Sequence, residues 1–418
     1  MLKRFNLMQL YEHQKEVLNN SNQFNRVAYY YDMGLGKTFI GSEKMHQLGN
    51  RVNLLVCQKS KVQDWLEHFK TYYSDYNIKD LTKNKIYHQG TNNKYIGVIN
   101  YDLIYRREFN IQDFTLILDE SSIIANETTK RSKAILKLKA ENVILLSGTP
   151  VSGRYEKLYS QCRLLGWNIT KKDFYERYVI EKEIRKDFVP FPLKIIVGYR
   201  NVEELKDNLK RYGAFFKKSD EVINLPEQNF NTLYCDVTSD YKKFVKDRII
   251  TINDKELVGD TTLTKMLYER QLCSQYNKNK IQLFKDLLND TDDRLIVFYN
   301  FNEELKILQE LTDRPVSVVN GSTRNLNNYE TKDNSITFIQ YQAGSKGLNL
   351  QKANKIIYFS LPLSVENFMQ SQKRIHRIGQ KNTCFYYILE ARDSIDTKVY
   401  NALKKGEDYT NYLFEGGE

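Results

Sequence analysis

Short apolar runs, separated by longer amphipathic stretches, recur along the chain in two groups. The first group comprises residues 26–31, 52–57, 95–100, 114–120 and 142–148, and each run ends in a polar or glycine-containing loop. The second group comprises residues 294–300, 315–321, 335–340, 355–360 and 384–390. Near-continuous apolar runs that alternate with helical stretches are typical of buried parallel strands in α/β sheets. The pattern therefore predicts two α/β units of similar size.

The region between the two groups has a different pattern. Residues 151–212 are rich in Tyr, Lys and Glu with mostly helical periodicity, and residues 240–290 also have a helical pattern. Pro226 and its polar neighbours predict a hinge. We therefore expect a first domain at 1–225, with a helical insertion at about 151–212, and a second domain at 226–418. A length of 418 residues agrees with two domains.

Composition narrows the class of protein without identifying it. A hydrophobic content of 41% with 28% charged residues indicates a globular chain. No apolar run is long enough to span a membrane and the start has no secretory signal, so a cytoplasmic protein is expected. The five cysteines lie far apart without a CxxC pair, which argues against disulfides and a zinc site. A net charge of +11 fits either a solvated surface or a polyanion partner.

The stretch "DMGLGKT" follows the first apolar run and precedes a helical pattern. Glycines at 34 and 36 allow backbone N–H groups to surround a phosphate, and the start of the following helix adds its dipole. Lys37 would reach the outer phosphates and Thr38 would offer a hydroxyl to Mg²⁺. Tyr31 stands where the strict pattern has glycine. The stretch predicts a phosphate-binding loop, with a structural glycine turn as the alternative.

An acidic pair, Asp119 and Glu120, ends the apolar run at 114–120. Two adjacent carboxylates after a buried strand are unusual unless a cation or a water molecule occupies them. We expect Asp119 to hold Mg²⁺, partly through water, and Glu120 to orient the attacking water. An ordinary transition from strand to loop is the alternative, and the upstream phosphate loop makes it much the weaker one.

Together these motifs resemble a superfamily-two helicase motor, closest to the Swi/Snf-like ATPases that translocate on duplex DNA. "DMGLGKT" and "LDES" are similar to the first two motifs, and "LLSGTP" (145–150) is similar to the third. "AGSKGLNL" (343–350) resembles the fifth motif and "QSQKRIHRIGQ" (370–380) the sixth, which is the most specific of them. "KKSDEVINLP" (217–226) resembles the family's connection between lobes. The resemblance covers the chain from about residue 8 to about residue 400.

The resemblance implies two tandem RecA-like lobes, with parallel sheets flanked by helices and an ATP site in the cleft between them. ATP and Mg²⁺ are the implied cofactors. Gln14 would read the adenine, and Arg377, supported by Arg374, would reach the γ-phosphate; the two arginines share a face if their segment is helical. The other implied nucleotide contacts are Met33, Gly34, Leu35, Gly36, Gly347, Asn349 and Gln370. Coupling to DNA would use Ser147, Gly148 and Thr149. Nucleic-acid contacts would come from Lys59, Ser60, Asn100, Tyr101, Asn320, Gly321, Ser322 and Tyr341.

The sequence departs from the family's pattern at several places. Ser121 and Ser122 replace the usual alanine and histidine, so we expect the coupling between ATP and DNA to be tuned differently. In the fifth motif Tyr341 replaces a common threonine and Ser345 a usual glycine. The segment after "SGTP" lacks the family's asparagine-rich continuation.

These features lead us to expect a DNA-stimulated ATPase that translocates on duplex or branched DNA, to remodel DNA or displace bound protein. A strand-separating helicase on DNA or RNA is the nearest alternative, and an ATP-gated loading factor with little turnover is the third. We expect a monomer that binds DNA, with a replication or repair protein as a candidate protein partner. It would be associated with the nucleoid, or lie in the host cytoplasm if a phage encodes it. A composition rich in Lys, Asn, Ile and Tyr is typical of an AT-rich genome, bacterial or phage.

Overall fold

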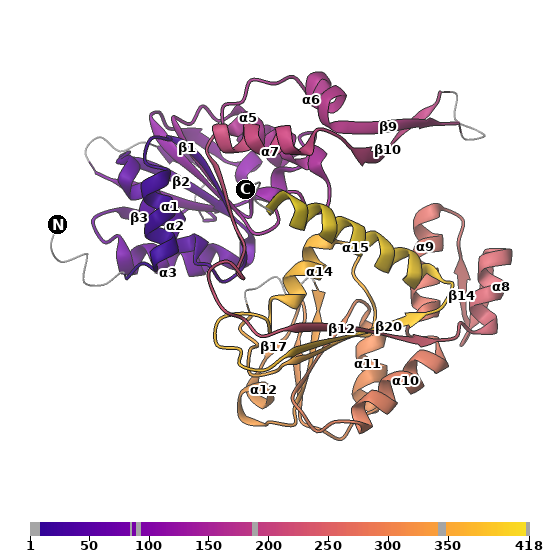
Figure 1. The fold of residues 1–418 in the computed structure, drawn as a ribbon. Coiled ribbons are helices and arrows are strands. Elements are labelled where there is room, and N and C mark those ends of the chain that lie inside the picture. Colours follow the sequence, from indigo (N-terminus) through magenta and orange to yellow (C-terminus); the bar gives the residue numbers. More distant parts are fainter. Residues whose placement is uncertain (1–8, 84–85, 89–92, 186–190, 342–347, 415–418) are drawn as a thin grey trace. The chain divides into compact units, whose positions relative to one another are not determined.

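The computed structural model describes residues 9–83, 86–88, 93–185, 191–341 and 348–414 (Figure 1). The chain forms two compact units, Met1–Val222 with Asp408–Glu418, and Ile223–Glu407. The division falls three residues before the predicted one at 225. Residues from Asp408 onward belong to the first unit, and their predicted place in the second domain is therefore wrong. Among the described residues, no helix combines the length and the apolar character that crossing a membrane requires.

The first unit contains a seven-stranded parallel sheet in the order β11-β1-β8-β7-β2-β5-β3. Its strands are β1 (Arg26–Tyr31), β2 (Val52–Cys57), β3 (Asn77–Asp80), β5 (Tyr95–Asn100), β7 (Phe114–Asp119), β8 (Asn142–Ser147) and β11 (Ala214–Lys217). The five strands predicted in this half are confirmed to within a residue. Every residue of β2 and β8 is buried, which explains their continuous apolar runs.

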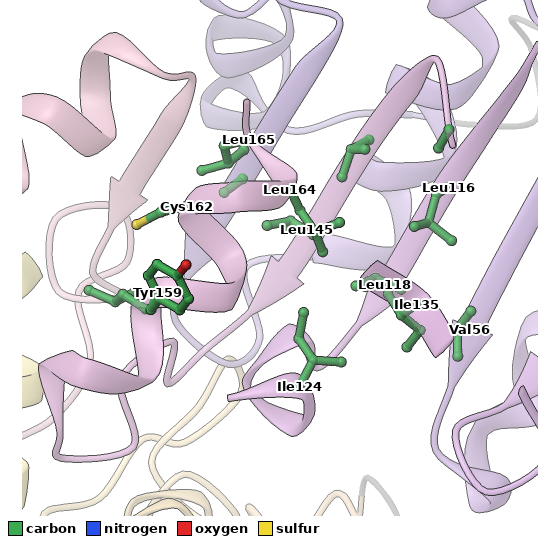
Figure 2. Packing of buried hydrophobic residues seen from close by; sticks show 14 of the residues in the cluster. Val56, Leu116, Leu118, Ile124, Ile135, Leu145, Tyr159, Cys162, Leu164 and Leu165 are labelled. Carbon is green, nitrogen blue, oxygen red and sulfur yellow. The ribbon is translucent and has the colours of Figure 1, made fainter. Parts of the chain in front are cut away.

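Helices and short segments connect these strands and cover the sheet. They are α1 (Glu12–Asn20), α2 (Lys37–Leu48), α3 (Val62–Tyr72), α4 (Lys130–Lys137), α5 (Tyr159–Leu164), α6 (Lys171–Tyr178) and α7 (Val202–Arg211), with the 3₁₀ turns η1 (Lys59–Lys61), η2 (Ile104–Arg106), η3 (Ser121–Ile124) and η4 (Tyr155–Leu158). Alternate residues of neighbouring strands, among them Val56, Leu116 and Leu145, share one face. They pack against Ile124 and Ile135, and Figure 2 shows this part of the core.

The predicted helical insertion at 151–212 is only partly helical. Between α6 and α7 lies an antiparallel hairpin of β9 (Val179–Ile184) and β10 (Leu193–Tyr199). Most residues of β9 are exposed, so this strand has no long apolar run, and its Glu and Lys residues, which favour helices, led to a helical interpretation. A second small ladder joins β4 (Ile86–His88) to β6 (Glu108–Asn110).

The second unit contains another seven-stranded sheet, in the order β12-β20-β19-β15-β18-β16-β17, and only its β16–β17 pair is antiparallel among the described pairs. Its strands are β12 (Gln228–Cys235), β15 (Leu295–Tyr299), β16 (Val316–Val319), β17 (Arg324–Asn325), β18 (Ile336–Gln340), β19 (Lys355–Tyr358) and β20 (Cys384–Ala391). The five predicted strands of this half are confirmed. The two parallel sheets establish the predicted fold class of two tandem α/β lobes.

The helices of this unit are α8 (Ser239–Asp247), α9 (Thr262–Cys273), α10 (Lys278–Asn289), α11 (Asn302–Glu310), α12 (Asn327–Thr331), α14 (Val365–Gln372) and α15 (Ile395–Phe414). A hairpin of β13 (Ile249–Ile252) and β14 (Lys255–Val258) interrupts the region predicted to be helical at 240–290. Helix α15 begins in the second unit, and its last turns belong to the first. There the hydroxyl of Tyr155 donates to the carbonyl of Tyr409 at 2.8 Å, and the N–H of Gly153 donates to Thr410 at 3.1 Å.

Candidate nucleotide-binding site

The segments with candidate chemistry in the first unit follow five neighbouring strands. Strands β1, β8, β7, β2 and β5 are adjacent and parallel, so their carboxyl ends lie along one edge of the sheet. The phosphate loop follows β1, the acidic pair closes β7, and the "SGTP" stretch follows β8. Ligands of open parallel sheets bind at this kind of edge. The sequence motifs are therefore brought together by the strand order alone.

The phosphate loop needs both of its glycines. Gly34 has φ 88° and Gly36 has φ 72°, and both lie in the left-handed region that favours glycine. Gly36 also caps α2 without a side chain, so no capping side chain competes with an anion for the N–H groups of Lys37 and Thr38 at the start of the helix. A Cβ at Gly36 would come within 2.1 Å of Nε2 of Gln14, which leaves no room for a side chain.

Gln14 lies directly against this loop. Its side chain is 2% exposed, its amide donates to the carbonyl of Leu35 at 3.2 Å, and its oxygen accepts from the N–H of Tyr11 at 2.9 Å. Nε2 of His13 lies 3.0 Å from the same Leu35 carbonyl. Gln14 therefore supports the loop, and its role in reading the adenine stays a prediction.

Lys37 opens α2 and turns its ammonium back toward the loop. Nζ donates to the carbonyls of Tyr31 at 2.7 Å and Asp32 at 3.1 Å. Burial lowers the pKa of Lys37, while the charges of Glu120, Asp32 and Asp119 oppose that shift. A Cβ at Gly148 would approach this Nζ to 3.4 Å, so the "SGTP" turn passes close by. A bound phosphate would offer Lys37 charged oxygens in place of the two carbonyls.

Asp119 is the last residue of β7, and neighbouring groups hold it on several sides. Its Oδ2 accepts the indole N–H of Trp65 at 2.8 Å, and its carbonyl accepts the hydroxyl of Tyr101 at 3.0 Å. Burial raises the pKa of Asp119, while the Trp65 hydrogen bond and the charges of Lys37 and Lys61 lower it.

Glu120 follows Asp119 with a left-handed backbone, φ 56° and ψ 60°, which is strained for a residue other than glycine. Two carboxylates beside a lysine and a phosphate loop form an oxygen-rich donor set of the kind that Mg²⁺ prefers. Thr38 lies in the first turn of α2, as a hydroxyl ligand requires. The residues present therefore fit a nucleotide with Mg²⁺.

A buried glutamine joins the segments behind the acidic pair. Oε1 of Gln161 accepts the hydroxyls of Ser121 at 2.7 Å and Tyr30 at 3.0 Å, and Nε2 donates to the carbonyl of Pro150 at 2.9 Å. Its side chain is fully buried. Ser121, one of the two serines that depart from the family's pattern, thus has a defined partner. We call Gln161, Ser121, Tyr30 and Pro150 the Gln161 cluster.

The coupling residues of the third motif are all buried. Ser147 accepts the N–H of Thr149 at 3.1 Å, and Oγ1 of Thr149 has no hydrogen-bond partner among the described residues. Sequence reasoning missed Gln161 and Trp65. Trp65 ends the quoted loop "CQKSKVQDW" and is one of only two tryptophans, but nothing in the sequence connects it to Asp119.

The candidate nucleic-acid contacts of the first unit divide into two kinds. Lys59 is exposed and Ser60 half-buried in η1, so both are accessible. Asn100 and Tyr101 are each only 3% exposed. The oxygen of Asn100 accepts the N–H groups of Asp102 and Leu103 at 3.0 and 3.1 Å, and so shapes the turn after β5. The predicted direct contacts of Asn100 and Tyr101 with nucleic acid are therefore wrong, because both side chains are buried.

The second unit shows the same contrast. Asn320 accepts the N–H of Ser322 at 3.0 Å in a turn that leaves Gly321 and Ser322 exposed. Tyr341 is 4% exposed, its hydroxyl donates to the carbonyl of Ser360 at 2.9 Å, and its ring lies 5.0 Å from that of Phe298. The predicted nucleic-acid contact by Tyr341 is wrong, because the ring that replaces threonine fills the lobe's core.

The arginines of the sixth motif do not lie on a helix. Helix α14 ends at Gln372, so Arg374 and Arg377 follow in turns, and the condition for a shared helical face is not met. Arg374 is 4% exposed, and burial lowers the pKa of Arg377. The guanidinium of Arg377 donates to the carbonyl of Leu348 at 3.4 Å. The amide of Gln370 donates to Glu366 at 3.1 Å.

Two further predicted nucleotide contacts follow β18. Asn349 is exposed, and Gly347 lies outside the described residues.

Comparison with known protein families gives two matches that together cover most of the chain. Residues 20–278 match the SNF2-related domain, and residues 279–379 match the helicase conserved C-terminal domain.

Two curated proteins illustrate the similarity. DNA repair and recombination protein RAD26 of Saccharomyces cerevisiae is 26% identical over 324 residues, covering 68% of this chain and 30% of that protein. The putative ATP-dependent helicase/translocase YwqA of Bacillus subtilis is 24% identical over 436 residues, covering 92% of this chain and 46% of that protein. The chain thus spans less than half the length of either relative.

A solved structure, the Sulfolobus solfataricus SWI2/SNF2 ATPase core in complex with dsDNA, is also similar. It is 19% identical in sequence, with 97% of this chain and 93% of that chain covered and a TM-score of 0.46.

Proposed function

Since this chain belongs to the SNF2-related domain family, we propose that it is an ATP-dependent motor that hydrolyses ATP while bound to duplex or branched DNA. One observation carries the proposal. The phosphate loop, Lys37 and the pair Asp119 and Glu120 converge at the carboxyl edge of one parallel sheet. A structural glycine turn would not require a lysine whose ammonium lies within the influence of three carboxylates, those of Glu120, Asp32 and Asp119.

Each residue of the first unit has a distinct part in this proposal. The N–H groups of the phosphate loop and the start of α2 bind the phosphates, and Lys37 leaves its two carbonyl partners for the outer phosphate oxygens. Thr38 and Asp119 hold Mg²⁺, which neutralises phosphate charge when bound. Glu120 orients the attacking water. Catalysis then consists of positioning and charge neutralisation.

Arg377 is proposed as the arginine finger for the γ-phosphate, with Arg374 in support. A guanidinium stays charged and matches phosphate oxygens with a rigid set of donors. In well-studied phosphoryl-transfer enzymes such a finger contributes roughly 10³–10⁵ in rate.

DNA is the proposed track because both units expose suitable groups. Lys59 and Ser60 in η1, and the turn from Asn320 to Ser322, are accessible for phosphate contacts. Such contacts carry no sequence information and weaken with salt. A strand-separating helicase would use the same ATP site and remains the second candidate. A loading factor with little turnover is disfavoured, because it need not retain both a water-orienting carboxylate and a finger arginine.

The test is steady-state ATP hydrolysis with no nucleic acid, with duplex DNA, with single-stranded DNA and with RNA, each at two salt concentrations. Strong stimulation by duplex DNA that weakens with salt supports the translocase, and displacement of a triplex strand then tests movement. Stimulation mainly by single strands or RNA favours the strand-separating helicase. No turnover under any condition contradicts the proposal.

Two substitutions separate binding from chemistry. Lys37→Ala removes the only ammonium described inside the loop and should abolish turnover and weaken nucleotide binding. Glu120→Gln keeps the shape of the site, so it should retain ATP binding while turnover stops. Binding of a fluorescent ATP analogue, measured beside turnover, distinguishes the two. Wild-type turnover in both variants would refute the site.

A further inference from the structure

The hydrogen bond from Trp65 to Asp119 joins two parts of the first unit that the proposed function uses separately. Trp65 lies in the first turns of α3, which begins directly after the turn η1 (Lys59–Lys61), where Lys59 is exposed and the other two residues are half-buried. Its side chain is 2% exposed and packs on Phe69, with ring centroids 5.3 Å apart. Its N–H points at Oδ2 of Asp119 at 2.8 Å. A basic turn is thus connected, through one turn of helix, to the carboxylate proposed to hold Mg²⁺.

The start of α3 is itself held by charge. Lys61 stands at the N-cap position of α3, and its ammonium pairs with Asp64 at 2.8 Å, on the turn that carries Trp65. Lys61 is also near enough to Asp119 to affect its pKa. A DNA phosphate that binds η1 would therefore act on the same helical turn from which the indole reaches the carboxylate.

The indole leaves the rest of the carboxylate available. Oδ2 is taken by the Trp65 N–H, while the backbone carbonyl of Asp119 is fixed by Tyr101. Side chain and backbone are thus held by groups that follow two other strands, β2 and β5. Outer hydrogen bonds of this kind orient a ligand carboxylate, and their loss typically costs 10–100-fold in metal affinity or activity.

We propose that Trp65 is a positioning residue of the motor, which orients Asp119 for Mg²⁺ and transmits DNA contact at Lys59–Lys61 to that carboxylate. This inference rests on the proposed function. DNA phosphates that bind η1 secure the first turn of α3, and the indole then holds Asp119 in the orientation that Mg²⁺ requires. At least part of the increase in ATP turnover that nucleic acid causes therefore depends on the hydrogen bond from Trp65 to Asp119.

The chain offers a matched control. Trp167, the only other tryptophan, is 7% exposed and stacks on Tyr212 with ring centroids 5.6 Å apart. It is in the same unit, where it belongs to the hydrophobic core and its ring lies near those of Phe174 and Tyr178. Trp65→Phe and Trp167→Phe therefore remove the same atoms from two buried aromatic sites, and only the first removes a donor to Asp119.

The first readout is turnover as a function of Mg²⁺ concentration, with ATP and duplex DNA saturating. We expect Trp65→Phe to raise the half-saturating Mg²⁺ concentration about tenfold or more and to reduce the stimulation by DNA. Trp167→Phe should keep wild-type values for both. Unchanged Mg²⁺ dependence and stimulation in Trp65→Phe would overturn the inference. If wild type itself shows no turnover on any nucleic acid, the proposed function has failed instead.

The second readout needs no turnover. In Trp167→Phe the only tryptophan is Trp65, so its emission reports on the environment of the Asp119 contact. Adding duplex DNA without nucleotide should change this emission, and the emission of Trp167 in Trp65→Phe should stay constant. Binding of a labelled duplex, followed by anisotropy, confirms that the DNA is bound. An unchanged Trp65 emission on bound DNA would overturn the inference.

A third measurement covers the case in which a variant does not fold. The unsubstituted chain, produced with 5-fluorotryptophan, has two ¹⁹F resonances. Duplex DNA, and Mg²⁺ with an ATP analogue that is not hydrolysed, should shift one of them, whereas two unmoved resonances would contradict the connection.

Discussion

The Gln161 cluster permits a prediction whose size follows from the structure. Replacing Gln161 by Met keeps the length of the side chain and removes its oxygen and its N–H groups. The hydroxyls of Ser121 and Tyr30 then lose their acceptor, and the carbonyl of Pro150 loses its donor. Each buried group left without a partner costs about 1–3 kcal/mol. Because hydroxyls can rotate toward other acceptors, we expect a total loss of about 3–5 kcal/mol.

Such a loss is a large part of the 5–15 kcal/mol by which a typical domain is stable. For a domain of roughly 150–250 residues, 1 kcal/mol shifts Tm by about 2–4 °C, so Gln161→Met should lower Tm by about 10 °C. Both tryptophans, Trp65 and Trp167, belong to the first unit. Tryptophan emission during heating therefore follows the unfolding of the unit that contains Gln161.

Gln63→Met provides the control. Gln63 lies on the exposed side of α3, where its amide donates to Glu67 at 2.8 Å. Surface changes of this kind usually alter stability by less than about 0.5 kcal/mol. A Tm for Gln161→Met within about 2 °C of wild type would refute the reasoning, since the lost hydrogen bonds would then be replaced at little cost. An equal fall in Gln63→Met would show that the method does not report on the cluster.

Two further predictions concern ionisable groups. His68 is partly buried with Nε2 2.9 Å from Ser42, and burial lowers its pKa to about 4. His68 of the unfolded chain binds a proton near pH 6.5, whereas His68 of the folded chain does not. The free energy of unfolding of the first unit should therefore fall by about 2 kcal/mol between pH 7 and pH 5. Urea unfolding of His68→Gln should show a smaller fall. In the second unit Lys280 and Asp396 form a buried ion pair. Lys280→Met should lower the free energy of unfolding by about 3–5 kcal/mol, measured by calorimetry. The double variant Lys280→Met, Asp396→Asn should recover much of this loss, and equal stability of the single and the double variant would contradict the prediction.

The parallel strands could be predicted closely because a strand that is buried on both faces is apolar at nearly every position. The runs at 26–31, 52–57 and 95–100 coincide with β1, β2 and β5. The hairpins could not be found in the same way. Both β9–β10 and β13–β14 expose many of their residues, so their strands lack the fully buried apolar pattern of β2 and β8.

The order in which the motifs of the candidate site come together could be predicted from the sequence, but the directions in which their side chains point could not. The resemblance to Swi/Snf-like motors is confirmed by the family match, and the strand order brings the first three motifs to one edge. A motif gives a position along the chain, whereas burial decides where a side chain points. The side chains of Asn100, Tyr101 and Tyr341 are therefore buried, although their motifs predicted contacts with nucleic acid. Contacts between segments distant in sequence, such as Trp65 with Asp119, leave no local signal.

The division of α15 between the two units has a consequence for synthesis on the ribosome. Tyr155 and Gly153 receive their partners from Tyr409 and Thr410, which follow 254 and 257 residues later. At a synthesis rate of about 5–20 residues per second, those partners are made on the order of 10–50 s after Tyr155 and Gly153. The first unit is thus interrupted in sequence by the whole of the second. Its last hydrogen bonds can close only after the second lobe has left the ribosome.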